Sequence, residues 1–122
     1  MTGEPAIESI SAVTLGVRDM ARSVRFYRAL GFQLRYGGED ASFTSFHVGN
    51  GYLNLLPQAP EGWWGRLILY VSDVDAMHRR VLEAGVTPDF EPQDAPWGER
   101  YFHVLDPDGH ELSFARPIER GG

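Results

Sequence analysis

An internal repeat constrains the fold of this chain more than any other feature of its sequence. The stretch LGVRDMARSVRFYRALG, which begins at Leu15, returns as LYVSDVDAMHRRVLEAG, which begins at Leu69. The tripeptide FHV at 46–48 also returns, at 102–104. Such a repeat indicates that one supersecondary unit occurs twice in the chain. Neither copy of such a unit can bury its apolar face alone. We therefore expect two similar modules of about fifty residues each.

Each copy predicts a strand, a helix and then further strands. The opening segments alternate between apolar and polar residues, as half-buried strands do. Asp19 and Asp73 stand where a carboxylate can accept the free N–H groups of a first helical turn. Gly31 and Gly85 suit the left-handed position that follows a last turn. Alternating segments then follow each helix, at 32–36, 43–48 and 51–56 in the first copy and at 87–91, 100–105 and 111–115 in the second.

This order of elements predicts an α+β fold made of two βαβββ modules. A chain of 122 residues is the size of one domain. We place that domain at 9–117, with module one at about 9–57, module two at about 66–117, and tails at 1–8 and 118–122.

Composition excludes several classes of function. The net charge of −6 disfavours nucleic acid as a partner, because phosphate binding depends on Lys and Arg. The sequence has no apolar run of about 18 residues that could span a membrane. It has no cysteine, which excludes disulfides and thiolate metal sites. The first ten residues, MTGEPAIESI, lack the pattern of an export signal. These features fit a cytoplasmic protein that binds neither nucleic acid nor membranes.

Several motifs, taken in order, resemble one known family. They are V-x-D leading into a helix that contains FY, then LGF, and finally DPDGHELSF near the end of the chain. This arrangement resembles the vicinal oxygen chelate superfamily, which includes glyoxalases, bleomycin resistance proteins and extradiol dioxygenases. The stretch APWGERYFHVLDPDGHELSFARP is most similar to the small resistance and glyoxalase-like members.

The resemblance implies a cupped mixed sheet with both helices on its outer face and the binding site on its concave face. It also implies a homodimer, often with the partner chain completing the cup. Strand alternation then assigns a face to each residue, since the more apolar parity must pack against the helices. The residues assigned to the cup are Ala12, Thr14, Gly16, Tyr52, Asn54, Leu56, Arg66, Ile68, Tyr70, Glu111, Ser113 and Ala115.

Metal-dependent members of the superfamily place one ligand on each of four strands. Matched motif by motif, those positions here are Ala12, Asn54, Arg66 and Ser113. Alanine offers no ligand atom, arginine is a fixed cation, and the neutral oxygens of Asn and Ser hold transition metals poorly. Glu111 could ligate after a one-residue slip of the strand, but one ligand does not make a site. We therefore expect no metal and no other cofactor.

Other residues then become candidates for ligand binding. Arg66 could hold a carboxylate, phosphate or enolate; alternatively, it is exposed or pairs with a nearby acidic residue. Aromatic side chains at cup positions or on nearby loops offer stacking area for a flat organic ligand. These are Trp63, Trp64, Trp97, Tyr52, Tyr70 and Tyr101. At least one of Trp63 and Trp64 could instead lie in a dimer interface.

The histidines divide into two pairs. His47 and His103 occupy equivalent places in the two modules, where they could act as general acid or base. The alternative is a half-buried strand histidine bonded to a backbone carbonyl. We expect His78 on a helix surface and His110 in an exposed turn.

Four functions remain open on this reading. The favoured one is a metal-free protein that sequesters an aromatic natural product or antibiotic in the clefts of a homodimer. The second is a metal-independent isomerase, cyclase or lyase that uses His47 or His103. A metal-dependent lyase or dioxygenase is disfavoured by the four ligand positions, and an interaction module without chemistry is the fourth.

Overall fold

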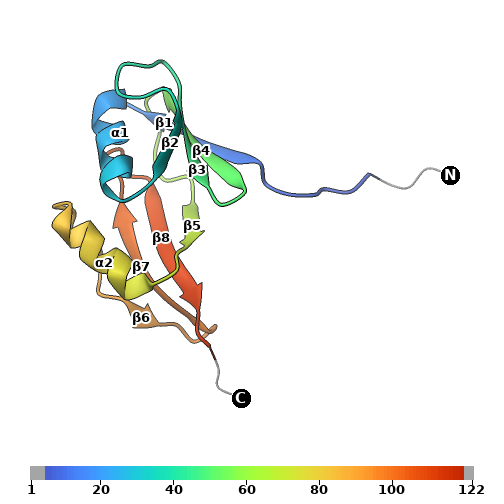
Figure 1. Cartoon of the computed structure of the whole chain (residues 1–122), viewed down its shortest axis with the longest axis vertical. Helices are drawn as coiled ribbons and strands as arrows, with labels where there is room; N and C mark the ends of the chain where they lie inside the picture. The colour runs from blue at the N-terminus through green and yellow to red at the C-terminus, as the bar shows by residue number, and fades with distance from the viewer. Residues whose placement is uncertain (1–4, 120–122) are drawn as a thin grey trace.

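Two four-stranded sheets, each with one helix, make up the computed structural model, which describes residues 5–119 (Figure 1). Module one contains β1 (Ala12–Val17), α1 (Met20–Ala29), β2 (Gln33–Tyr36), β3 (Thr44–Val48) and β4 (Gly51–Pro57). Module two contains β5 (Arg66–Tyr70), α2 (Val74–Glu83), β6 (Gln93–Asp94), β7 (Glu99–Leu105) and β8 (Glu111–Pro117). The strand orders are β1-β4-β3-β2 and β5-β8-β7-β6, with β1 and β5 parallel to their neighbours and the other pairs antiparallel. The predicted α+β fold is confirmed.

Both helices begin and end where the sequence predicts. The Oδ1 atom of Asp19 accepts the N–H of Arg22 at 3.0 Å, and Oδ1 of Asp73 accepts that of Ala76 at 3.0 Å. Each helix is followed by a glycine with positive φ, 99° at Gly31 and 81° at Gly85, which favours glycine because it has no Cβ. No helix within residues 5–119 is long and apolar enough to cross a membrane.

One predicted strand is wrong. We expected extended strand at 87–91, but this segment is irregular, and β6 is a two-residue strand at Gln93–Asp94. Pro88 lies inside the segment and Pro92 follows it directly, and the two lost backbone donors are incompatible with a regular ladder of hydrogen bonds. The segment still passes beside β7, because the N–H of Asp89 donates to the carbonyl of His103 at 2.9 Å.

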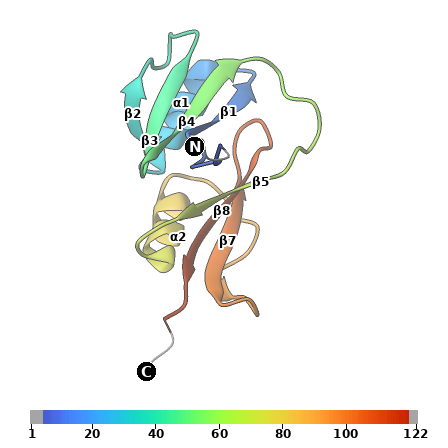
Figure 2. The ribbon, with the colours of Figure 1, turned by 90° about the vertical axis from the view of Figure 1, so that its right-hand side faces the viewer.

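Both helices cover the same side of the molecule and leave the opposite faces of the sheets open (Figure 2). Side chains at alternate strand positions, such as Leu15 and Leu55, pack with Val24 of α1 and are buried. The corresponding residues of module two, including Leu112 and Val81, extend the same core. Burial of these apolar side chains stabilises each module, at roughly 25 cal/mol per Å².

The β7–β8 turn of module two is anchored to α1 of module one. The hydroxyl of Tyr27 donates to Oδ2 of Asp106 at 2.7 Å, in a buried position. Asp108, whose side chain is fully buried, accepts the backbone N–H of Arg18 at 2.9 Å and the hydroxyl of Ser23 at 3.3 Å. Arg22 lies 3.8 Å from the same carboxylate. These contacts, here called the Asp106/Asp108 anchor, fix one module against the other.

The surroundings of the buried Tyr27 hydroxyl determine its pKa. Burial, followed by the charge and hydrogen bond of Asp106, raises its pKa well above 10.0, so the hydroxyl stays protonated and remains a donor. Removing that donor leaves a buried carboxylate oxygen without a partner.

We expect Tyr27→Phe to lower the free energy of unfolding by about 1–3 kcal/mol, the cost of an unpaired buried acceptor. Urea denaturation monitored by circular dichroism measures this change. Tyr36→Phe is the matched control, because Tyr36 is 63% exposed, and it should change stability by less than about 0.5 kcal/mol. Equal effects of the two substitutions would contradict the importance of the anchor.

Candidate ligand-binding site

The open face of module two combines large exposed apolar side chains with a few charged groups. Cross-strand pairing puts Arg66 beside Glu111, Ile68 beside Ser113, and Ser113 beside His103. Ser113 itself is only 4% exposed and forms part of the floor of this face. The exposed apolar side chains on or near the face are Trp63, Ile68, Tyr70, Trp97 and Leu105. Exposed apolar patches rimmed by polar residues are common at interaction and ligand-binding surfaces.

A cluster of polar side chains surrounds Glu111. Its Oε1 atom accepts a hydrogen bond from Nη2 of Arg66 at 2.9 Å and lies 3.1 Å from Nδ1 of His103. Its Oε2 atom accepts the indole N–H of Trp63 at 3.1 Å. We call these four residues the Glu111 cluster. The loop residue Asp89 lies at its border, with a carboxylate oxygen within 4.8 Å of ligand-type atoms of His103 and Glu111.

Opposing effects set the charges in the Glu111 cluster. Burial acts to raise the pKa of Glu111, but hydrogen bonds from Arg66 and Trp63 outweigh it, and the net pKa is lowered. Burial, and then the charge of Arg66, lower the pKa of His103 below 6.5 against the opposing effects of Glu111 and Asp89. Near neutral pH the cluster therefore contains an ionised Glu111 and a neutral His103. Nδ1 of His103 faces the carboxylate of Glu111, while Nε2 has no hydrogen-bond partner within residues 5–119.

A row of rings continues from His103 along the same face. The ring centroids of Tyr101 and His103 are 5.2 Å apart, and those of Trp97 and Tyr101 are 5.4 Å apart. Phe90 packs edge-on against His103 at 5.1 Å. Glu99 accepts the indole N–H of Trp97 at 3.0 Å and the hydroxyl of Tyr70. This aromatic row, Phe90–His103–Tyr101–Trp97, offers a surface on which a flat ligand can stack.

The open face of module one has a different chemistry. The guanidinium of Arg35 lies over the ring of Tyr52, 4.0 Å from its centroid, and its Nη1 donates to the hydroxyl of Ser45 at 3.3 Å. The rings of His47 and Tyr52 are 5.8 Å apart. Asn54 donates from Nδ2 to the hydroxyl of Thr14 at 3.3 Å, while its buried Oδ1 has no partner within residues 5–119.

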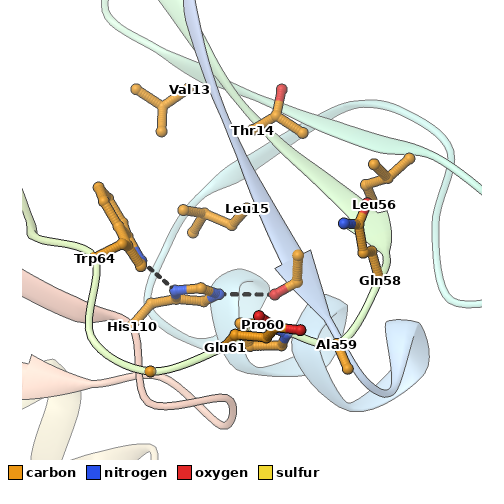
Figure 3. A pocket seen from close by; sticks show the side chains of 12 residues that line it. Val13, Thr14, Leu15, Leu56, Gln58, Ala59, Pro60, Glu61, Trp64 and His110 are labelled. Atoms are coloured by element: carbon orange, nitrogen blue, oxygen red, sulfur yellow. Dashed lines mark hydrogen bonds between the residues drawn. The ribbon is translucent and has the colours of Figure 1, made fainter.

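A pocket of about 500 Å³ lies between β1 and the connection from β4 to β5 (Figure 3). Trp64 forms one side of it and donates its indole N–H to Nδ1 of His110 at 2.6 Å. Because an indole can only donate, Nδ1 of His110 accepts and its Nε2–H donates to the carbonyl of Gly16 at 2.7 Å. The two tryptophans therefore diverge: Trp63 joins the Glu111 cluster, and Trp64 lines this pocket.

The structure groups the predicted site residues in three places. Arg66, Glu111, His103 and Trp63 come together, and Tyr70, Tyr101 and Trp97 lie beyond them on the same face. His47, Tyr52 and Asn54 lie on the open face of module one. Arg66 pairs with Glu111, which is the second of the two alternatives that the sequence left open.

Two residues were misjudged from the sequence. His110 was expected in an exposed turn but is 4% exposed, because the anchored turn carries it against β1. Arg35 was not recognised as a candidate at all. A β-bulge between Leu34 and Tyr36 brings it opposite Ser45, and no local sequence signal marks that bulge.

Comparisons with known proteins establish the family. The model of the Glyoxalase/Bleomycin resistance protein/Dioxygenase superfamily matches residues 9–114, and the chain belongs to this superfamily. It is 25% identical to the bleomycin resistance protein of Geobacillus stearothermophilus, over 93% of this chain and 98% of that protein. An uncharacterized protein of Mycobacterium bovis is 46% identical over 50 residues, which are 41% of this chain and 33% of that relative. This chain thus matches about a third of the mycobacterial protein.

Solved structures agree with this assignment. TioX from Micromonospora sp. ML1 is 29% identical, with a TM-score of 0.72 over 91% of this chain and 100% of that one. A glyoxalase/bleomycin resistance protein/dioxygenase from Nocardioides has a TM-score of 0.77 at 21% identity, over 97% of this chain and 89% of that one. The second likeness supports the fold alone.

The four positions at which the resemblance places metal ligands do not fit a metal ion in this chain. Ala12 has no ligand atom, and the guanidinium of Arg66 is held against Glu111. Ser113 is buried and neutral, and Asn54 offers one amide. Asp89, His103 and Glu111 have the residue types of a metal site, but Arg66 already places a positive charge 2.9 Å from Oε1 of Glu111. We derive no metal chemistry from either group.

We expect His103 to titrate below 6.5 in the folded protein, and Arg66→Met to raise that pKa, because the substitution removes a nearby positive charge. Nuclear magnetic resonance titration of the imidazole measures both values. The unfolded chain then binds a proton that the folded chain does not, so the free energy of unfolding falls as the pH drops below about 6.5. Arg28→Met, on α1, is the control and should leave the titration unchanged.

Proposed function

We propose that this protein binds a small aromatic molecule without a metal ion and sequesters it in the clefts of a cytoplasmic homodimer. The observation that carries the proposal is the aromatic row of module two, next to the Glu111 cluster, in which Trp97 is exposed and the other three rings are partly exposed. Aromatic surfaces with a few fixed polar groups are typical of small-molecule sites. The poor fit of the four metal positions favours binding over metal-dependent chemistry.

The relatives support this class of ligand. The bleomycin resistance proteins of Geobacillus stearothermophilus and Staphylococcus aureus align with this chain over nearly their full length. Bleomycin, a large natural product with planar aromatic parts, is therefore a rational first probe. Sequestration requires binding alone, which fits a face rich in stacking area.

A second copy of the chain is the proposed cover for the open face. Trp63, Ile68 and Leu105 are 68%, 59% and 49% exposed, which is unusual for a group of large apolar side chains in a monomer. Their burial between two copies would turn an open face into a cleft. Light scattering coupled to gel filtration should give the mass of a dimer, and Leu105→Asp should shift it toward the monomer.

We expect Trp97→Ala to weaken the binding of metal-free bleomycin by roughly tenfold or more, because it removes a large stacking surface. Isothermal titration calorimetry measures the affinity. Leu82→Ala is the control, since Leu82 is a comparably exposed apolar residue on α2, on the helix side of the sheet. If neither the wild type nor the control binds bleomycin or any member of an aromatic natural-product panel, the proposal is wrong.

Acid–base catalysis without a metal is the second candidate function. The 3.1 Å approach of Nδ1 of His103 to Oε1 of Glu111 favours it, because a carboxylate that orients an imidazole is a common general-base arrangement. His103→Ala separates the two candidates. A binding protein would show no turnover in either form, whereas an enzyme would convert its ligand in the wild type and lose that turnover in His103→Ala. His47→Ala, on the other open face, is the comparison.

A further inference from the structure

We infer that the open face of module one holds the planar carboxylate of an aromatic organic anion through Arg35. This inference rests on the proposed function, because the anionic group would belong to the same aromatic ligand. It assigns the charge recognition to Arg35 rather than to Arg66.

A bulge in β2 sets the position of Arg35. Leu34 pairs with Phe46 and Tyr36 pairs with Ser45, so the bulge places both Arg35 and Tyr36 opposite Ser45. Bulges bend a strand locally and redirect side chains, and they are common beside functional sites. The guanidinium consequently reaches across β3 to Tyr52 on β4, instead of pointing outward from the edge of the sheet.

Two contacts fix the guanidinium in that position. It stacks over Tyr52 at 4.0 Å, and Nη1 donates to Ser45 at 3.3 Å. Ser45 is fully buried, so this donor contact ties Arg35 to the rigid part of the sheet. A guanidinium has five N–H groups, and these contacts leave most of them available. A stacked, oriented arginine suits paired hydrogen bonds to a planar anion.

Arg35 also lacks a counter-ion. Among the described residues, no carboxylate lies within 4.0 Å of its guanidinium, whereas Arg66, the other arginine on the open faces, is paired with Glu111 at 2.9 Å. A guanidinium that is held by Tyr52 and Ser45 and that no carboxylate among residues 5–119 neutralises is available for an external anion.

Asn54 adds a second point of recognition beside Arg35. Ser45 and Asn54 are direct cross-strand partners, so their side chains lie on one face. The buried Oδ1 of Asn54 has no partner among residues 5–119. The Nδ2 group donates one N–H to Thr14 and keeps a second N–H for a ligand. The subsite thus combines one fixed cation with one neutral donor.

A pair of probes that differ in charge tests the inference. We would titrate 2-naphthoate and 2-naphthamide into the protein by calorimetry at low salt. The wild type should bind the carboxylate roughly tenfold more tightly than the amide, as expected for a charge-assisted pair. Arg35→Met should abolish this preference, and Arg28→Met, a control at an exposed helical arginine, should retain it. Asn54→Asp should weaken naphthoate selectively, because it adds a negative charge to the subsite.

The possible results are distinct. If both probes bind the wild type equally, or if the preference survives Arg35→Met and disappears in Arg66→Met, the inference is wrong while aromatic binding stands. If neither probe nor bleomycin binds the wild type, the proposed function fails and the inference fails with it. Circular dichroism and the thermal midpoint of Arg35→Met show whether that variant folds, and the exposure of Arg35 predicts that it does.

Discussion

The carboxylates of Asp106 and Asp108 hold the two modules in one relative orientation. Each sits in a buried position and accepts hydrogen bonds from α1 or from the residues that lead into it. The turn also uses its own backbone, since Oδ1 of Asp106 accepts the N–H groups of Asp108 and His110 at 2.9 Å. Because these bonds fix the turn, they also fix β7 and β8, and with them the direction in which the second open face points.

The residues that stabilise the fold and those that could bind a ligand lie on opposite sides of the sheets. The anchor and the shared core are on the helix side, while the Glu111 cluster and the aromatic row are on the open side (Figure 2). The exception is His110, which belongs to the anchored turn yet holds Trp64 in the wall of a pocket. The shape of the pocket beside β1 therefore depends, at Trp64, on how the two modules pack together.

Short-range features of the sequence made the fold predictable. The repeat, the capping aspartates and the glycines after the helices each act over a few residues, so the modules could be predicted. The irregular segment at 87–91 was missed because two prolines outweigh its alternating pattern. The pairing of Arg66 with Glu111 follows from strand register and was foreseen as an alternative. His110 and Arg35 depend on a docked turn and a bulge, which only the three-dimensional structure reveals.

The bulge in β2 bears on how ligand preference could change during evolution. β2 is an edge strand with a neighbour on one side, so an insertion or deletion there need not disturb β3, β4 or the core. Loss of one residue would restore regular pairing and carry the guanidinium away from Tyr52. Members of a lineage could therefore gain or lose charge selectivity through single-codon length changes, which alignments that score substitutions alone would overlook.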